Sequence, residues 1–409
     1  MKKTLRYNFR LNPAPCQEAK LIEFGAYARG LWNLLLSENI RRYQYDKTFL
    51  FYREMADLIT QLKAFEEFAW LKAFDSAAAQ QVARDLDLAL RNACSKERLQ
   101  RFPKHKITFR QKKLHDDSFR VVNNANCIRI EDGCISIPKV GKVPIVLHRK
   151  LVSQIKTATL QYRHGKWQIS IVQEVDCAPR KDLLTSVTGY DINSHFSVVG
   201  SNGWYVTNAR ALKQSMEKLN HLQRQMARRK KGSKRWIKTR NRINKLHGKI
   251  SRQRLALAHE VTNSIANSSD IVIFENLNVK AMQRFNGSMV ADNVMGMITQ
   301  MARYKVELNG GLYHEIGRFV KSTGICQACG HHHTLSLSVR TFTCTHCAMR
   351  QCRDLSAAAC VALSGEKELI AAGTVVRVAP NAQQKASGQT KVFGRVLKFG
   401  AGSEQKEAA

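Results

Sequence analysis

The stretch VTGYDINSHFSVVGSNGWYVT (residues 187–207) carries the pattern around which the rest of the chain is organised. The stretch contains two short strand-like runs joined by the dipeptide Asn202-Gly203, which is typical of a hairpin turn. We therefore expect strands here, with Asp191 inside the first of them. A carboxylate in an apolar strand is a candidate for metal-dependent chemistry, although an acid at a strand end is more often a turn or cap residue.

A long basic segment follows these strands. Apolar residues recur at helical spacing over 211–230 and 235–266, and Gly232-Ser233 separates the two runs. This predicts a helical hairpin over 211–266, with Lys and Arg on its other faces. Such a face is often merely solvated, but this one has few acidic partners in the sequence. We expect its densest cations to contact phosphates: Arg228, Arg229, Lys230, Lys231, Lys234 and Arg235.

Two further acids stand at the ends of predicted elements. The run SDIVIFENL has the short, continuous apolar core of a fully buried strand, and Glu275 lies at its exit. The segment CRDLSAAACVAL predicts a helix with Asp354 as its N-cap. An α/β region is therefore expected from 187 to about 363.

Four cysteines form two pairs, Cys326-x-x-Cys329 and Cys344-x-x-Cys347, which are separated by 14 residues. This is close to the zinc-ribbon spacing, and four thiolates complete a tetrahedral zinc site without leaving a position for water. The sequence therefore predicts a structural Zn²⁺ site. The alternatives are buried free cysteines, or a histidine ligand from the run 331–333 or from His346.

The first half of the chain combines strands and helices. Residues 3–12 alternate as a half-buried strand does, helical spacing dominates 16–100, and short alternating runs with a turn at Asp132-Gly133 follow from about 106 to 178. A helical segment thus interrupts a β-rich domain. Together with the second half, this predicts an α+β multidomain protein.

The charge balance restricts the class of partner. Lys and Arg number 66 against 32 acids, a net charge of +34, which favours a polyanionic partner such as nucleic acid. No apolar run is long enough for a membrane span, and the N-terminus lacks the apolar core of an export signal. We expect no membrane partner and a reducing, cytosolic compartment, in which clustered cysteines indicate metal.

The order of these features resembles the TnpB family of bacterial transposons and the related type V CRISPR effectors. The likeness extends over almost the whole chain. It rests on a strand with a central acid, a Glu-x-Leu strand exit, a C-x-x-C-G knuckle and a final Arg-Asp motif. These motifs stand here as Gly189-Tyr190-Asp191-Ile192-Asn193, Glu275-Asn276-Leu277, Cys326-x-x-Cys329-Gly330 and Arg353-Asp354-Leu355-Ser356-Ala357-Ala358.

The resemblance implies an RNA-guided DNA endonuclease in which Asp191, Glu275 and Asp354 converge on two Mg²⁺ ions within a RuvC, RNase H-like domain. It also implies a guide RNA, double-stranded target DNA, a separate transposase of the same element, and the bacterial or archaeal cytosol near the nucleoid. In the first half, the implied segments are an oligonucleotide-binding-like wedge domain over 1–15 and 101–185 and an inserted helical recognition domain over 16–100. In the second half, they are a nuclease domain over 186–363, which contains the hairpin 211–266 and a zinc-knuckle insert over 321–352, and a poorly ordered tail over 364–409. The residues that fall where the family reads a short adjacent DNA motif are Tyr52, Gln80 and Asn124.

The chain departs from the family pattern beside the acids. Asn193 stands in place of a Gly, Cys352 in place of an acid or His, and Ser356 in place of an Asn. These departures leave open a second hypothesis, a guided repressor of the same family that binds DNA and cuts it slowly or not at all. A third hypothesis, a basic zinc-ribbon protein that binds RNA, does not explain the acids in the strands.

Overall fold

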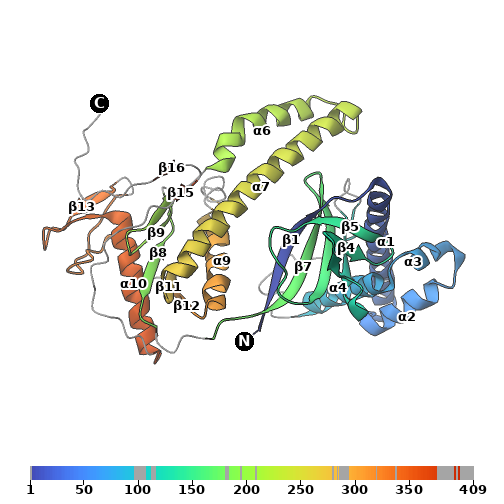
Figure 1. The fold of residues 1–409 in the computed structure, drawn as a ribbon, viewed down its shortest axis with the longest axis horizontal. Coiled ribbons are helices and arrows are strands. Elements are labelled where there is room, and N and C mark those ends of the chain that lie inside the picture. Colours follow the sequence, from blue (N-terminus) through green and yellow to red (C-terminus); the bar gives the residue numbers. More distant parts are fainter. Residues whose placement is uncertain are drawn as a thin grey trace. The chain divides into compact units, whose positions relative to one another are not determined.

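The computed structural model describes residues 2–95, 107–111, 117–179, 184–193, 196–207, 210–278, 281–282, 284, 294–318, 320–336, 339–374, 391–392 and 395–396. The chain divides into two compact units, Lys2–Val175 and Asp176–Ala409, and each is described by itself (Figure 1). Most of the tail expected over 364–409 lies outside the described residues. Its described parts are the end of α10 and the strand pair β15 (Lys391–Val392) and β16 (Arg395–Val396).

The first unit contains a seven-stranded sheet in the order β2-β6-β7-β1-β5-β4-β3. Its strands are β1 (Lys2–Leu11), β2 (Ser118–Val122), β3 (Ile130–Glu131), β4 (Cys134–Ile137), β5 (Gly141–Val146), β6 (Ile155–Arg163) and β7 (Lys166–Asp176). The strand predicted over 3–12 is confirmed as β1, which lies inside the sheet. The predicted turn between β3 and β4 is also confirmed, because Asp132 and Gly133 both have a positive φ, of 50° and 70°.

Helices separate β1 from β2 in the chain, as the sequence predicts. They are α1 (Pro15–Asp46), α2 (Tyr52–Leu62), η1 (Glu66–Phe68), α3 (Trp70–Ala73) and α4 (Ser76–Cys94), and η2 (Asn124–Asn126) follows β2. The helices and the sheet share one hydrophobic core. Phe24 of α1 meets Phe74 and β2 residue Phe119 edge to face, with ring centroids 5.5 and 5.6 Å apart.

The second unit contains a five-stranded sheet in the order β10-β9-β8-β11-β12. Its strands are β8 (Val187–Asp191), β9 (Phe196–Gly200), β10 (Tyr205–Thr207), β11 (Ile271–Glu275) and β12 (Leu312–Ile316). β9 runs antiparallel to both β8 and β10, and β11 runs parallel to both β8 and β12. The hairpin predicted from Asn202-Gly203 and the buried strand predicted before Glu275 are both confirmed.

Helices cover both faces of this sheet. On β11, Val272 and Phe274 pack with residues of α7 (Lys234–Ser268) and α9 (Met295–Leu308), whereas Ile271 and Ile273 pack with residues of α10 (Arg353–Ala371). All four side chains are fully buried, which explains why β11 is apolar at each position from Ile271 to Phe274 rather than at every second one. The result is a three-layer α/β/α arrangement (Figure 1).

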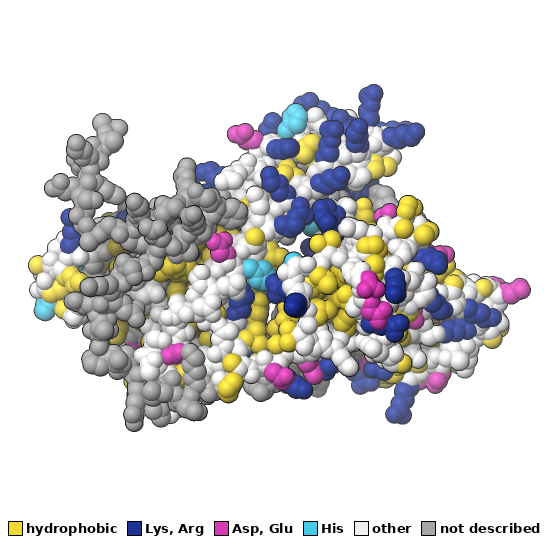
Figure 2. Space-filling model, viewed as in Figure 1, with side chains coloured by type: hydrophobic (Ala, Val, Ile, Leu, Met, Phe, Trp, Pro, Cys, Tyr) yellow, Lys and Arg dark blue, Asp and Glu magenta, His cyan; other side chains and the backbone are white. Residues whose placement is uncertain are grey.

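The basic segment forms a helical hairpin of α6 (Ala211–Ala227) and α7, as predicted. The two helices pack through Leu219, Leu222 and Ile243. Figure 2 shows Lys and Arg side chains gathered over this hairpin. None of the described helices combines the length and the apolar character that crossing a membrane requires.

Candidate functional site

Strand periodicity brings Asp191 and Glu275 to one face of the sheet. Tyr190 of β8 lies opposite Phe274 of the parallel strand β11, so the two acids follow at the same edge. Side chains alternate between faces along a strand. Asp191 therefore shares a face with Gly189, and Glu275 shares that same face with Ile273, which packs toward α10.

A close approach of backbones places α10 on this face. A Cβ added to Gly189 would lie 2.4 Å from the backbone nitrogen of Ala362 and 2.5 Å from the carbonyl oxygen of Ala358. Only glycine allows a helix to lie so near to β8. As a consequence, the start of α10, which carries Asp354, lies near the end of β8.

Asp354 does not cap its helix, and the N-cap prediction is wrong. The N-cap of α10 is Cys352, so Asp354 is the second residue of the first turn. The helix begins earlier than expected because β14 (Arg350–Cys352) pairs with β13 (Thr341–Thr343) and leads directly into α10. Asp354 is buried, and its Oδ2 atom accepts no hydrogen bond in the described part of the protein.

The three acids interact electrostatically. The pKa of Asp191 is raised to about 7, chiefly by burial and further by the negative charges of Glu275 and Asp354, against the opposing effects of a hydrogen bond from Asn193 and the charge of Arg353. Asp191 of β8 and Asp354 of α10 are buried, Glu275 of β11 is half-buried, and the charges of Glu275 and Asp354 both act on Asp191. A cation would relieve their mutual repulsion, and carboxylate oxygens are the ligands that Mg²⁺ prefers.

Three polar side chains contact these acids. None of the three was identified from the sequence as a partner of an acid. Asn193 Nδ2 donates to Asp191 Oδ2 over 3.0 Å, and Ser322 Oγ donates a short hydrogen bond to Glu275 Oε1. The Arg340 guanidinium lies 3.6 Å from Asp354 Oδ2. Asn193 was noted only as a departure from the family pattern, and Ser322 and Arg340 carry no motif signal of their own.

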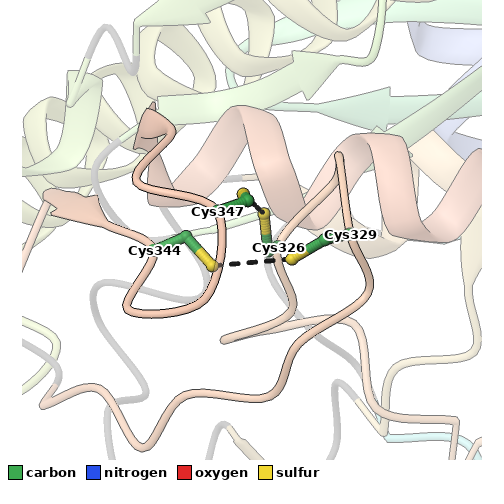
Figure 3. A group of neighbouring side chains, drawn as sticks. All are labelled: Cys326, Cys329, Cys344 and Cys347. Carbon is green, nitrogen blue, oxygen red and sulfur yellow. Dashed lines mark hydrogen bonds between the residues drawn. The ribbon is translucent and has the colours of Figure 1, made fainter.

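The predicted cysteine cluster is brought together by the fold (Figure 3). The four sulfur atoms lie within 4.8 Å of one another, and Cys326–Cys347 and Cys329–Cys344 are each 3.6 Å apart. Two sulfurs bound to one tetrahedral zinc ion at about 2.3 Å would lie roughly 3.8 Å apart. Across the described residues, this is the only group of three or more His, Cys, Asp or Glu that gathers its ligand atoms so closely.

The two cysteine pairs form matching turns. The amide of Gly330 donates to the carbonyl of Cys326 over 2.8 Å, and the amide of Ala348 donates to the carbonyl of Cys344 over 2.9 Å. The fifth residue of each turn has a left-handed backbone, with φ of 73° at Gly330 and 55° at Ala348. The two knuckles are thus built alike, although only the first has the glycine that suits this conformation.

The backbone of the second turn favours a thiolate. Burial alone would raise the pKa of Cys344, but two backbone amides within its turn and the ring of His333 lower it to about 5. The ring nitrogen Nε2 of His333 lies 3.3 Å from the sulfur. The pKa of Cys329 shifts in the opposite direction, to about 12: the backbone at His331 lowers it, but burial and hydrogen bonds with the other three cysteines raise it by more. We assign the thiolate to Cys344, since three donors converge there.

Family models match three separate parts of the chain. Residues 173–286 match a model described as "Probable transposase", residues 296–361 match "Cas12f1-like, TNB domain", and residues 1–48 match "Helix-turn-helix domain". Over 316 residues the chain is 27% identical to the Escherichia coli K12 protein "Putative RNA-guided DNA endonuclease InsQ", covering 77% of this chain and 74% of that protein. The chain belongs to the TnpB family.

A second relative spans nearly the full length of this TnpB-family chain. It is the Streptomyces pristinaespiralis protein "Putative RNA-guided DNA endonuclease", which is 25% identical over 394 residues and matched over 94% of both chains. The matched models divide the candidate site between them. Asp191 and Glu275 lie in the transposase segment, whereas the four cysteines and Asp354 lie in the segment 296–361.

Two solved structures are similar to this TnpB-family chain. One is described as "Cryo-EM structure of the Cas12f1-sgRNA-target DNA complex", with 13% identity, a TM-score of 0.33, and coverage of 88% of this chain and 99% of the other. The second is described as "Cryo-EM structure of CRISPR-Cas12f Ternary Complex", with 13% identity, a TM-score of 0.34, and coverage of 85% and 82%.

The predicted phosphate contacts lie at the tip of the hairpin of this TnpB protein. Arg229 is half-buried, and its guanidinium donates to the carbonyl of Arg235 over 2.9 Å and to the hydroxyl of the fully buried Thr239. Arg229 therefore holds the tip together. The other five cations are exposed there: Arg228, Lys230, Lys231, Lys234 and Arg235.

The three residues expected near the adjacent motif lie in the first unit. The Tyr52 ring, at the start of α2, lies 4.5 Å below the guanidinium of Arg84, whose nitrogen also donates to the Tyr52 hydroxyl over 3.2 Å. Gln80 is exposed on α4, one helical turn before Arg84. Asn124 is exposed at the start of η2.

Proposed function

We propose that this TnpB-family chain is an RNA-guided DNA endonuclease. The observation that carries the proposal is that Glu275 and Asp354, from two other elements, act on the buried Asp191, whose pKa is raised by burial and by these two charges. Perturbed carboxylates gathered in this way are typical of catalytic sites. The names of the two curated relatives support the same activity.

The proposed nuclease domain is RuvC-like and spans 186–363. The sheet order β10-β9-β8-β11-β12 and the helices on both of its faces support this assignment. In the first unit we propose a wedge domain made of 1–15 and 101–185, with a recognition domain of 16–100 inserted in it. The helices between β1 and β2 support this division.

We assign two Mg²⁺ ions to the three acids. Bound there, such ions would activate a water for in-line attack and stabilise the leaving 3′ oxygen. Asp354 offers a buried oxygen without a hydrogen-bond donor, and Asp191 contributes a second desolvated carboxylate. Ser322 engages one oxygen of Glu275 and leaves the other for a ligand. Asn193 orients Asp191 in the same way.

The remaining parts bind the nucleic acids. The exposed cations at the hairpin tip would neutralise phosphates of the guide RNA or its duplex with target DNA, since Glu217 and Glu260 are the only acids between residues 211 and 268. Base pairing with the guide would select the target, and the first unit would read a short adjacent motif. We assign that reading to Tyr52, Gln80 and Asn124. A separate transposase encoded by the same element would be a further partner.

We assign one structural Zn²⁺ to Cys326, Cys329, Cys344 and Cys347. The close sulfur distances and the lowered pKa of Cys344 support this assignment. Elemental analysis of protein purified without chelator should find about one equivalent of zinc, and Cys329→Ser should lose it. Less than about half an equivalent in the wild type would contradict the assignment.

Cleavage of a guided target tests the function. The protein is purified with its RNA, the RNA is sequenced, and a matching DNA duplex is assayed with Mg²⁺ and with EDTA. Asp191→Ala, Glu275→Ala and Asp354→Ala should each abolish cleavage, because ligands that act as one unit fail together. Target binding should persist in all three variants. A wild type that binds guided targets without cutting them at any Mg²⁺ concentration would establish the repressor alternative.

A further inference from the structure

The two segments that carry the cysteine pairs also carry the side chains that contact the acids. Ser322 stands four residues before Cys326, and Arg340 stands four residues before Cys344. Ser322 contacts Glu275, and Arg340 lies against Asp354. We call residues 322–329 the first arm and residues 340–347 the second arm of the cysteine cluster. Each arm therefore contacts one acid of the candidate site.

The first arm is fixed at several points between Ser322 and the cluster. Ser322 is 7% exposed and donates to Glu275 Oε1. Gly324 follows with a φ of 81°, and a Cβ there would lie 2.4 Å from the carbonyl oxygen of His333. The carbonyl of Ile325 accepts a hydrogen bond of 2.6 Å from the hydroxyl of Ser356, which is buried in α10. The arm cannot move without disturbing α10.

The second arm is held by a short strand pair. Thr341 of β13 pairs with Cys352 of β14, and the amide of Arg353 donates to the carbonyl of Arg340 over 2.8 Å. This ladder holds the backbone of Arg340 next to the start of α10. Its guanidinium consequently faces Oδ2 of Asp354, the buried oxygen that accepts no hydrogen bond from the described residues.

We propose that the ion held by the four cysteines sets the affinity of the acid site for divalent cations, with Ser322 and Arg340 as the positioning residues that link the two sites. The inference rests on the proposed function, in that it takes the three acids to be ligands of a divalent cation. Ser322 restricts the rotation of Glu275, which favours binding. Arg340 places a positive charge beside Asp354, which opposes a second cation there.

The two arms therefore have opposite effects on cation binding. Loss of the Ser322 hydrogen bond frees the Glu275 carboxylate, so Ser322→Ala should weaken binding roughly tenfold, the typical effect of one hydrogen bond to a charged group. Arg340→Ala removes a competing charge and should tighten binding by about the same factor. A residue with only a structural role would weaken binding in both cases.

The proposal is tested by titrating the whole chain with Mn²⁺ and monitoring binding by electron paramagnetic resonance. The zinc content of each sample is measured in parallel. Ser322→Ala and Arg340→Ala should keep their zinc and shift the Mn²⁺ affinity in opposite directions. Ser322→Thr and Arg340→Lys, which retain the hydroxyl and the charge, should return the affinity to near the wild-type value. Thr323→Ala and Arg350→Ala are the matched controls, since Thr323 is an exposed residue of the first arm and Arg350 is an exposed residue of β14, which pairs with the second arm.

A double-mutant cycle with the cluster completes the test. In a Cys347→Ser background, from which zinc is lost, Ser322→Ala should change Mn²⁺ affinity by less than about twofold, because the arm no longer transmits its position. If Ser322→Ala and Arg340→Ala both bind Mn²⁺ as the controls do, the proposal is overturned. A wild type whose Mn²⁺ binding is unaffected by Asp354→Ala would instead refute the acid site itself. The zinc-loaded variants decide the matter even if Cys347→Ser fails to fold.

Discussion

The side-chain amide of Asn193 donates to Oδ2 of Asp191 over 3.0 Å, and the backbone amide of Phe196 donates to the side-chain oxygen Oδ1 of Asn193 over 2.8 Å. Asn193 therefore links the acid at the end of β8 to the start of β9. Its amide stabilises the ionised form of Asp191, which burial destabilises. A glycine here, as the family pattern has, would lack this donor.

Asn193→Gly should move the acidic limb of the cleavage profile to higher pH. The amide of Asn193 lowers the pKa of Asp191, so its removal leaves burial and the neighbouring charges less opposed and raises that pKa above about 7. Because a metal ligand must be deprotonated, more base is then needed for activity. The check is the pH dependence of kcat/KM for wild type and variant. An acidic limb that stays in place, or moves to lower pH, contradicts the role given to Asn193.

Asp191→Asn should stabilise the chelator-treated protein at high pH. The pKa of Asp191 is raised from 3.8 to about 7 in the folded state, so the folded protein holds this proton more tightly than the unfolded one. Stability is therefore lost as pH rises from about 4 to 7, by up to about 4 kcal/mol. Asparagine avoids that loss. Thermal unfolding in EDTA should show a higher Tm for the variant at pH 8.5 and no gain at pH 4.

If Asp191→Asn raised the Tm equally at pH 8.5 and pH 4, packing rather than ionisation would account for the stabilisation. Asn193→Gly provides a matched comparison, since it leaves the Asp191 carboxyl in place. Added Mg²⁺ should raise the Tm of the wild type at pH 8.5 and leave that of Asp191→Asn nearly unchanged, because only the wild type keeps the complete set of ligands.

Regular elements and their order were predictable because they depend on local periodicity. The buried strand before Glu275, the turn at Asn202-Gly203 and the basic hairpin each leave a pattern of apolar spacing or turn residues in the sequence. The gathering of the four cysteines was predictable from spacing alone, and the structure brings their sulfurs together.

The contacts between the arms and the acids were not predictable. Arg340 reaches Asp354 only because two three-residue strands, β13 and β14, pair beside α10, and such short strands have no clear period. The same pairing makes Cys352 the N-cap of α10, which is why the capping role expected for Asp354 was wrong. Arg229 looks like its neighbours in the sequence, and only the folded tip distinguishes it.

Ala348→Gly should strengthen zinc retention. Ala348 has a φ of 55°, a region that glycine adopts without the steric cost that a Cβ imposes. The expected gain is about 0.5–1 kcal/mol, measured as slower zinc release to a chelating dye. Gly330→Ala, the equivalent change in the other turn, should have the opposite effect. Among the described residues, chain neighbours aside, no atom lies within 4 Å of a Cβ added at Gly330, so that effect would arise from the backbone alone. If both variants release zinc at the wild-type rate, the two turns do not limit the stability of the cluster.

Arg228→Ala and Arg229→Ala should differ in kind, although the two residues are adjacent. Arg228 is exposed at the hairpin tip, so its loss removes one phosphate contact, weakens RNA binding and reduces the salt slope by about 1. Arg229 is engaged by the Arg235 carbonyl and the Thr239 hydroxyl, so its loss should loosen the tip. The expected cost is about 1–3 kcal/mol of hairpin stability, because the buried Thr239 hydroxyl loses this donor.

RNA affinity measured across a series of salt concentrations separates the two roles, and hydrogen exchange of the 228–239 amides reports tip stability. Arg229→Ala should speed exchange while keeping nearly the wild-type salt slope, whereas Arg228→Ala should do the reverse. Arg229→Lys retains the charge but not the guanidinium whose Nη1 atom donates to both partners, so it should resemble Arg229→Ala in exchange. Equal reductions in salt slope for Arg228→Ala and Arg229→Ala, with no change in exchange, would mean that Arg229 leaves its two partners and contacts phosphate when RNA binds.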